Sequence, residues 1–240
     1  MSDPYEHILQ SLQFYQTSEY PCSYLPDEQA RSLVAAPAHL IDNNVYSNLV
    51  AQGFRRSGLF TYRPDCRKCQ ACMPIRIDVS AFNVRRSHKR VIKKNSNLIS
   101  RSLPLQWNDE HYELYVEYQR VRHPGAGMDT DTEKQYKQFL LSSAVDSRLI
   151  EFRDQAGKVQ IIALTDILDN SLSAVYTFYN PLSDRSLGTY SILWQIMQCK
   201  SLDMPWLYLG YWIQNSRKMA YKSQFKPYQL LVNGQWSYVD

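Results

Sequence analysis

Four of the five cysteines lie in the first third of the chain and have a spacing typical of metal ligands. Two residues lie between Cys66 and Cys69 and again between Cys69 and Cys72, and Cys22 lies upstream. This spacing lets neighbouring thiolates converge on one ion. Four thiolates suit structural zinc or an iron–sulfur cluster. The alternative is free thiols in a tight turn. We favour a metal at these cysteines and leave its identity open.

A second chemical signal is a basic stretch over residues 85–101 that contains seven cations and no acid, in a chain whose net charge is only +4. Such a run attracts phosphates and predicts RNA binding, although a solvated basic helix face is the plain alternative. Two further lysines, Lys218 and Lys222, are one helical turn apart and are expected to share a face. The predicted RNA-binding residues are Arg85, Arg86, Lys89, Arg90, Lys93, Lys94, Lys218 and Lys222.

Residues 185–190 resemble the turn that holds the pyrophosphate of coenzyme A in N-acetyltransferases. The backbone N–H groups at a helix start bind anions, and Gly188 is at the expected place. The position that needs a second small residue is Tyr190, whose ring is expected to keep the pyrophosphate from approaching the turn. The turn therefore indicates an acyltransferase-like fold whose coenzyme A site is lost.

The elements that position these residues are read from periodicity and turn signals. Strands are predicted over residues 33–36, 54–62, 74–79, 148–153, 159–168, 172–179 and 206–211, with a last hairpin over 230–238. Helices are predicted over 42–53, from Asp109 onward, and over 132–143 and 188–202. The order of these elements favours an α+β fold with a mainly antiparallel sheet flanked by helices. We place a small cysteine-containing domain at residues 1–83 and a larger domain at residues 84–240.

The N-terminus lacks the features of a signal peptide, and no apolar stretch reaches the ~18 residues of a transmembrane helix. We therefore expect a cytoplasmic protein that does not enter a membrane.

Taken together, the segments of this chain resemble the arginyl/leucyl-tRNA–protein transferase family, in particular its bacterial aspartate/glutamate leucyltransferase branch. The resemblance runs in order over nearly the whole chain, and the ordered set is more specific than any one piece. The matching stretches lie at residues 21–26, 53–58, 62–64, 66–76, 163–166, 173–179, 186–189, 208–213 and 219–222.

The resemblance implies a second domain similar to GCN5-related N-acetyltransferases (GNAT-like) that accepts aminoacyl-tRNA in place of acyl-coenzyme A. It implies transfer of leucine from leucyl-tRNA to proteins that begin with Asp or Glu, which creates a degradation signal of the N-end rule. No cofactor is expected for transfer, because the amino acid is already activated as an ester. A zinc ion or iron–sulfur cluster at the cysteines would be structural.

The chemistry needs a positioned neutral amine and a stabilised oxyanion. Asp166, at the end of its strand, is the predicted proton acceptor, although a turn-capping aspartate is an equal alternative; Tyr211 or Tyr221 is the predicted oxyanion donor. An arginine fork matches the carboxylate of the acceptor. By family match, the candidates are Arg55, Arg56 and Arg76.

Three alternatives remain open from sequence. The donor specificity could be arginyl, since physical reasoning does not rank it against leucyl. The protein could be a coenzyme A-dependent N-acetyltransferase, which Tyr190 argues against. It could also be a non-catalytic RNA-binding protein with a zinc module.

Overall fold

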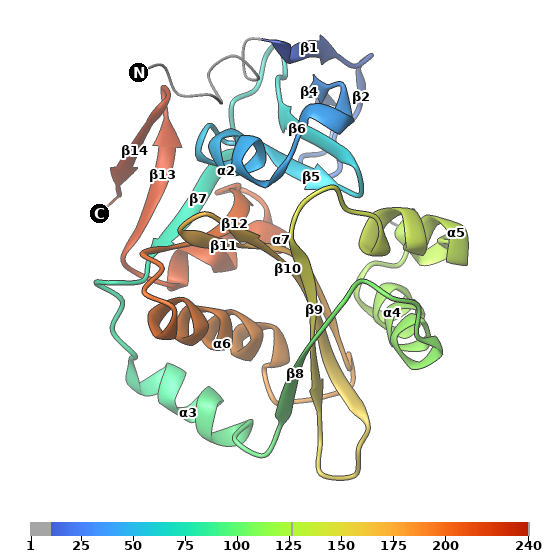
Figure 1. The fold of residues 1–240 in the computed structure, drawn as a ribbon, viewed down its shortest axis with the longest axis vertical. Helices are drawn as coiled ribbons and strands as arrows, with labels where there is room; N and C mark the ends of the chain where they lie inside the picture. The colour runs from blue at the N-terminus through green and yellow to red at the C-terminus, as the bar shows by residue number, and fades with distance from the viewer. Residues whose placement is uncertain (1–10, 126, 240) are drawn as a thin grey trace.

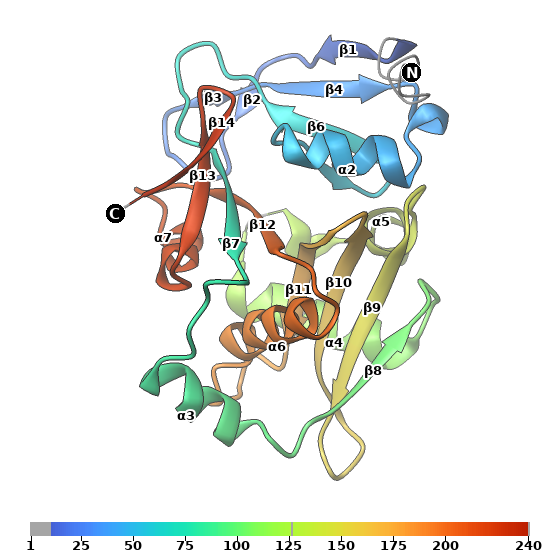
Figure 2. The same cartoon turned by 60° about the vertical axis from the view of Figure 1, so that its left-hand side comes forward.

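The computed structural model describes residues 11–125 and 127–239, without the side chain of Arg217, and shows two main sheets (Figures 1 and 2). The smaller sheet has the strand order β1-β4-β6-β5. Its strands are β1 (Gln13–Gln16), β4 (Ser32–Ala36), β5 (Arg55–Ser57) and β6 (Phe60–Pro64). A short ladder of β2 (Tyr20–Pro21) and β3 (Gln29–Ala30) lies beside it.

The larger sheet has eight strands in the order β14-β13-β7-β12-β11-β10-β9-β8. Every neighbouring pair is antiparallel except β11 and β12, which are parallel. Its strands are β7 (Met73–Asp78), β8 (Ile99–Leu103), β9 (Ser147–Arg153), β10 (Val159–Leu168), β11 (Ser171–Tyr179), β12 (Trp206–Trp212), β13 (Tyr228–Val232) and β14 (Gln235–Tyr238).

Helices cover both faces of the larger sheet. In Figure 1, α4 and α5 lie on one side of β9 and β10, and α6 lies on the other side with α3 beneath it. The helices are α2 (Asn43–Ala51), α3 (Arg86–Lys94), α4 (Asp109–Arg122), α5 (Glu133–Tyr136), α6 (Leu187–Ser201) and α7 (Arg217–Ala220). Short 3-10 turns occur at Ala38–Leu40, Met128–Thr130 and Tyr221–Gln224, and a π-helical turn at Lys137–Leu141.

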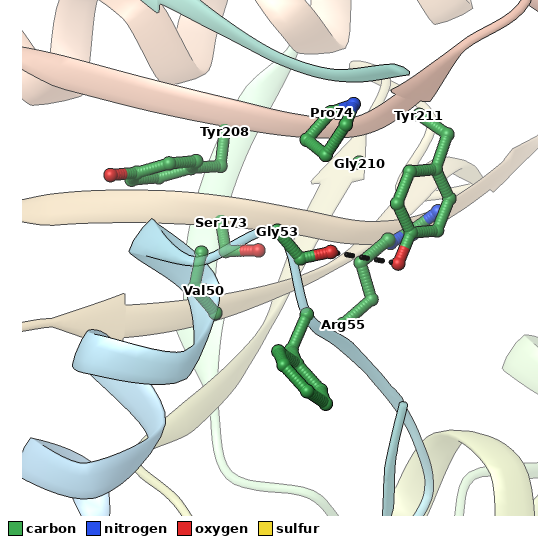
Figure 3. A pocket seen from close by; sticks show the side chains of 9 residues that line it. Val50, Gly53, Arg55, Pro74, Ser173, Tyr208, Gly210 and Tyr211 are labelled. Atoms are coloured by element: carbon green, nitrogen blue, oxygen red, sulfur yellow. Dashed lines mark hydrogen bonds between the residues drawn. The ribbon is translucent and has the colours of Figure 1, made fainter. Parts of the chain in front are cut away.

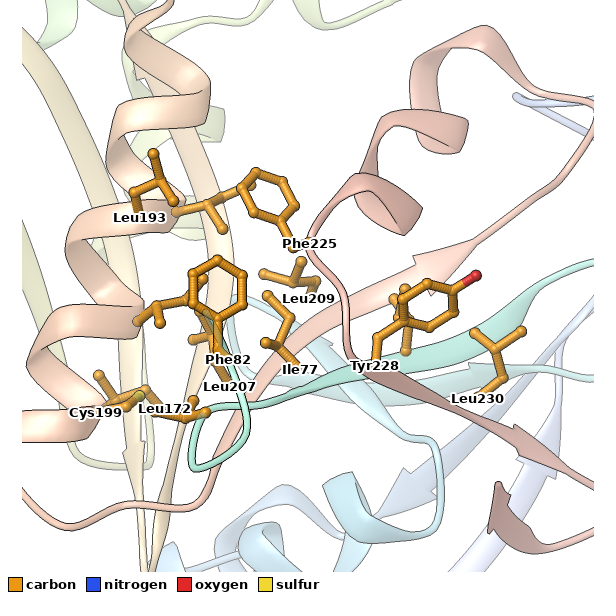
Figure 4. Packing of buried hydrophobic residues seen from close by; sticks show 14 residues of the cluster. Ile77, Phe82, Leu172, Leu193, Cys199, Leu207, Leu209, Phe225, Tyr228 and Leu230 are labelled. Carbon is orange, nitrogen blue, oxygen red and sulfur yellow. The ribbon is translucent and has the colours of Figure 1, made fainter. Parts of the chain in front are cut away.

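Buried apolar side chains hold these layers together. Figure 4 shows the cluster between α6 and the sheet, where Leu193 and Cys199 of α6 face Leu207 and Leu209 of β12. A second cluster, rich in tyrosine, lies between α4, α5 and the opposite face of β10 and β11. A third joins α2 to the larger sheet. The burial of such apolar area is the main favourable term in folding.

The predicted fold class is confirmed: helices flank a mainly antiparallel sheet. The helix predicted after residue 42 is present, with the Asp42 carboxylate accepting from Val45 N at 2.9 Å. The final hairpin turns at Asn233 and Gly234, both with positive φ, as its Asn-Gly pair predicts.

Three element predictions need correction. The strand expected over residues 54–62 is two strands joined by a turn at Gly58, where φ is +58° and a Cβ would lie 2.2 Å from the Gln138 carbonyl. The helix expected to be capped by Asp109 is capped by Asn108, whose side chain accepts from His111 N at 3.2 Å. The helix expected over 132–143 is the short α5 followed by a π-helical turn.

The predicted division at residue 83 stays a prediction. Strand β7 lies before that boundary, yet it pairs with β12 and β13 inside the larger sheet. In the described residues, no helix is long and apolar enough to cross a membrane.

Candidate functional site

The centre of the molecule is the place where β11 and β12 separate. Their parallel pairing covers only Ser171 to Ser173 against Trp206 to Tyr208. Beyond that point β11 stays paired with β10, and β12 stays paired with β7 across an irregularity between Tyr208 and Tyr211. Each strand is therefore held by its outer neighbour, and no ladder joins the two beyond Ser173 and Tyr208. We call the space between them, which side chains such as Arg55 and Tyr211 largely fill, the β11–β12 opening.

Arg55 extends from β5 into this opening (Figure 3). Its Nη2 donates to the Val175 carbonyl of β11 at 2.7 Å, and its Cζ lies 5.7 Å from the centre of the Tyr211 ring of β12. Gly210 makes this possible, because φ there is +71° and a Cβ would lie 2.4 Å from Arg55 Cζ. The side chain thus bridges the two diverging strands beside a cavity of about 10 Å³, the size of one water molecule.

Lys222 is a second cation close to this opening. It is only 5% exposed, and its Nζ donates to the Tyr211 carbonyl at 2.6 Å. Burial first, and the charge of Arg55 second, hold the pKa of Lys222 well below its ordinary value. Neither Arg55 nor Lys222 forms an ion pair within the part of the chain that the structure describes. A half-buried guanidinium and a buried amine that lack a carboxylate partner among the described residues favour an anionic ligand, whose charge would also favour the protonated form of Lys222.

The position of Lys222 corrects its predicted role. Lys218 is exposed, whereas Lys222 is buried, so the two do not share a face. The physical reason is that α7 ends at Ala220 and a 3-10 turn follows, which changes the direction of the side chains. Lys222 therefore cannot meet a tRNA backbone in this conformation.

Arg56 and Asp166 form a buried ion pair. Arg56 Nη2 lies 2.6 Å from Asp166 Oδ1, and Nε donates to Oδ2 at 2.8 Å. Asp166 Oδ1 also accepts from Ser147 Oγ at 2.8 Å, and its side chain has no exposed surface. This geometry argues against Asp166 as the proton acceptor and against Arg56 as an acceptor-binding residue, because each group is already occupied by the other.

Arg76, the third arginine predicted to bind the acceptor, lies between two indole rings. Its Cζ is 3.7 Å from the Trp206 ring centre and 4.4 Å from that of Trp236. Nε and Nη2 donate to Gln229 Oε1 at 2.9 and 2.7 Å, and Nη1 donates to the Tyr208 hydroxyl at 3.2 Å. The guanidinium joins β7, β12, β13 and β14, and its predicted contact with the acceptor stays a prediction.

The two tyrosines predicted as oxyanion donors differ in their surroundings. The Tyr211 hydroxyl donates to the Gly53 carbonyl at 2.9 Å, so its proton is used to fix the backbone just before β5 (Figure 3). This contact argues against Tyr211 as the oxyanion donor. Tyr221 is 46% exposed, next to Lys222. Of the two, only Tyr221 has a side chain that a substrate can reach directly.

A surface groove of about 420 Å³ runs between the turn at residues 22–26 and the loop before α7. Its lining includes Cys22, Tyr24 and Lys218. Tyr24 lines this groove; burial raises the pKa of its hydroxyl, and the nearby Arg55 lowers it by less. Tyr24 was not singled out from sequence, since nothing local distinguishes it from the other tyrosines.

The cysteines lie at the same end of the molecule. Burial, and then the neighbouring thiols of Cys66, Cys22 and Cys69, raise the pKa of Cys72 to about 12. Among the described residues, however, no three His, Cys, Asp or Glu side chains are arranged as metal ligands. The zinc or iron–sulfur assignment therefore stays a prediction.

The basic stretch forms α3, with its cations directed outward. Its predicted RNA-binding side chains, Arg85 through Lys94, are all exposed. The helix is anchored by His88, which stacks between Phe82 and Phe225 at ring-centre distances of 5.5 and 5.9 Å. The apolar side packs on the core, and of these cations only Lys94 forms an ion pair within the described residues, with Asp184 at 2.8 Å.

The turn before α6 differs from its sequence-based expectation. Tyr190 is buried and packs against Phe152 at 5.8 Å between ring centres, so its ring lies in the core and not over the helix start. The expected obstruction by Tyr190 is therefore wrong. Instead, Arg185 folds back over the neighbouring helix and donates to the Lys94 carbonyl at 2.7 Å.

The chain has close relatives among known proteins. The family models "Arginine-tRNA-protein transferase, N terminus" and "Arginine-tRNA-protein transferase, C terminus" match residues 20–90 and 110–232. Aspartate/glutamate leucyltransferase of Thiobacillus denitrificans is 56% identical over 234 residues, which cover 97% of each chain. The proteins of the same name from Nitrosospira multiformis and Chromobacterium violaceum are 52% and 51% identical, over 96% and 94% of this chain and 92% and 93% of their own.

Proposed function

The chain belongs to the arginine-tRNA-protein transferase family, and we propose that it transfers leucine from leucyl-tRNA to the N-terminal Asp or Glu of acceptor proteins. The proposal rests on relatives named aspartate/glutamate leucyltransferase that match this chain almost end to end. The product carries a new N-terminal leucine, which is a degradation signal of the N-end rule. The donor is a cytoplasmic molecule, which supports the cytoplasm as the compartment.

The reaction joins an amine to an activated ester. The α-amine of the acceptor attacks the leucyl carbonyl, an amide bond forms, the ester bond to the terminal ribose breaks, and a proton passes from the amine to the ribose oxygen. No cofactor is needed, because the ester supplies the driving force. The residues must orient the two substrates and exclude water.

Arg55 and Lys222 are the side chains that we propose to read the acceptor carboxylate. Arg55 is half-buried in the β11–β12 opening and Lys222 is buried next to it, and neither has an acidic partner among the described residues. An acidic side chain that enters from the groove beside Tyr24 would neutralise this charge. An amide side chain of the same shape would leave the positive charge unpaired. This difference is a strong basis for discrimination between Asp or Glu and their amides.

The exposed cations of α3, together with Lys218, are the proposed contacts to the tRNA backbone. Tyr221 is the remaining candidate for oxyanion stabilisation, since its side chain is exposed next to the buried Lys222.

A matrix of donors and acceptors tests the function. Radiolabelled leucyl-tRNA and arginyl-tRNA are each mixed with peptides that begin with Asp, Glu, Asn or Ala. We expect label to move only from leucyl-tRNA, and only to the Asp and Glu peptides. Transfer from arginyl-tRNA would replace the donor assignment, and absence of transfer with every pair would overturn the function.

The role of Arg55 is tested by the ratio of kcat/KM for Asp over Asn peptides. Arg55→Lys keeps a positive charge but loses the planar fork, so we expect this ratio to fall by about tenfold or more. Arg148→Lys is the matched control, because Arg148 pairs with Asp146 at the surface, where both side chains are 42% exposed. An unchanged Asp-to-Asn ratio in Arg55→Lys would remove Arg55 from acceptor recognition.

A further inference from the structure

The face of the larger sheet that α4 covers holds a carboxylate without a cation. Asp131 follows the 3-10 turn Met128–Thr130 and is half-buried. Its Oδ2 accepts from the Tyr115 hydroxyl at 2.5 Å, and its backbone carbonyl accepts from the Tyr112 hydroxyl at 3.3 Å. No ion pair to Asp131 occurs among residues 11–125 and 127–239.

Two unpartnered polar groups lie in the same cluster. Gln119 has no exposed surface; its Nε2 donates to the Tyr176 hydroxyl at 2.7 Å, and its Oε1 has no partner in the described structure. The Tyr136 hydroxyl is also buried and has no hydrogen-bond partner among the described residues, and its ring centre lies 5.0 Å from that of Tyr115. Buried polar atoms without a partner are rare in folded proteins, and each one suggests a ligand or a water.

The chemistry of this cluster suits a small cation. It offers a carboxylate, an amide group and the faces of several tyrosine rings, and the charge of the carboxylate is not neutralised. Carboxylate oxygens and aromatic faces together recognise ammonium groups. A burial penalty and the Asp131 hydrogen bond raise the pKa of Tyr115, so this hydroxyl stays a neutral donor to the carboxylate.

The cluster also adjoins the proposed reaction centre. Tyr176 follows Val175, whose carbonyl is bound by Arg55, so one short segment of β11 contacts both groups. The Tyr24 hydroxyl is near enough to Tyr176 to raise its pKa, although burial is the larger cause. Adjacent residues of β11 therefore connect the Arg55 contact with the cluster that contains Asp131.

We propose that Asp131, supported by Tyr115, Gln119 and Tyr176, binds the α-ammonium of the leucyl group on the donor tRNA. This assignment rests on the proposed function. The ammonium would be held as a cation, which prevents the donor amine from competing as a nucleophile. A positive charge next to the ester also makes its carbonyl more electrophilic. Asp131 thus orients the donor, while Arg55 and Lys222 orient the acceptor.

The test compares two donors in single-turnover transfer to an Asp peptide. One donor is leucyl-tRNA, and the other is its α-hydroxy analogue, in which a hydroxyl replaces the ammonium. We expect the wild-type protein to use the analogue about 10- to 100-fold less well. Asp131→Asn should lower transfer from leucyl-tRNA by a similar factor and leave transfer from the analogue within about twofold, because a charged contact is lost only with the natural donor.

Controls separate this subsite from a loss of structure. Tyr115→Phe should change the ratio of the transfer rates from the two donors in the same direction as Asp131→Asn does. Glu133→Gln should leave that ratio unchanged, since Glu133 is an exposed carboxylate in the adjoining helix.

Each other outcome overturns the assignment. The wild type could use both donors equally well, or Asp131→Asn could lose the same factor of transfer with both donors. Asp131→Asn could also raise the KM for the acceptor peptide and leave the transfer rates from the two donors in their wild-type ratio. If the wild type transfers no leucine at all, the proposed function itself fails.

Discussion

At the scale of residues, two adjacent arginines have opposite roles because they lie on a strand. Successive side chains of a strand point to opposite faces, so Arg55 enters the β11–β12 opening and Arg56 reaches Asp166 of β10. From sequence, both arginines were candidates for acceptor binding by family match, and Asp166 was the candidate proton acceptor. The sequence could not pair Arg56 with Asp166, because 110 residues separate them.

The Arg56–Asp166 pair provides a prediction about stability. Asp166→Asn leaves a buried guanidinium without its counter-charge, so we expect the free energy of unfolding to fall by about 3–5 kcal/mol. The measurement is denaturant unfolding followed by circular dichroism.

Asp146→Asn is the control for that pair, because Asp146 pairs with Arg148 where both side chains are 42% exposed. That substitution should lower the free energy of unfolding by less than about 1 kcal/mol. If Asp166→Asn is as mild as Asp146→Asn but abolishes transfer at unchanged stability, Asp166 acts in chemistry after all.

At the scale of elements, α3 shows how a helix can carry a large charge and still fold. Only three of its side chains, His88, Val91 and Ile92, pack toward the core, and its cations remain in water. The basic run was visible in the sequence, and its outward direction follows from where those three residues fall in the helical period. The stacking of His88 between two aromatic rings was not predictable, since Phe225 is far away in the chain.

The cationic surface of α3 leads to a prediction about tRNA binding. The triple substitution Lys89→Ala, Arg90→Ala and Lys93→Ala should weaken binding of leucyl-tRNA. It should also reduce the magnitude of the slope of log affinity against log salt by up to about 2.7, because each phosphate contact contributes roughly 0.9 to that slope through counterion release. Fluorescence anisotropy over a salt series measures this slope.

Lys158→Ala, in the exposed turn between β9 and β10, is the control for nonspecific charge and should leave the slope unchanged. The same slope in the triple variant and the wild type would place the tRNA elsewhere.

At the scale of the whole molecule, β7 ties the two halves of the chain together. It comes from the cysteine-containing part, yet it lies in the middle of the larger sheet between β12 and β13. The larger sheet of residues 84–240 is consequently incomplete without the first part of the chain. The Arg56–Asp166 pair adds a second connection of the same kind.

The predicted boundary can be tested with two separate chains. Residues 84–240 alone lack β7 and leave Asp166 unpaired, so we expect no cooperative unfolding transition from this fragment. Co-expression with residues 1–83 should restore the transition. Thermal unfolding by calorimetry distinguishes the two cases, and a cooperative transition from residues 84–240 alone would show that the boundary separates an independent domain.

The sequence by itself determined the order and type of most elements, the fold class and the family, because periodicity, turn residues and ordered motifs are local properties of the chain. The tertiary structure alone decided which side chains meet. It buried Lys222, paired Asp166 with Arg56, set Arg55 between β11 and β12, and placed Asp131 beside Tyr115 with no ion-pair partner among the described residues. The physical reason is that burial and charge pairing depend on contacts between residues far apart in the chain, which local patterns do not encode.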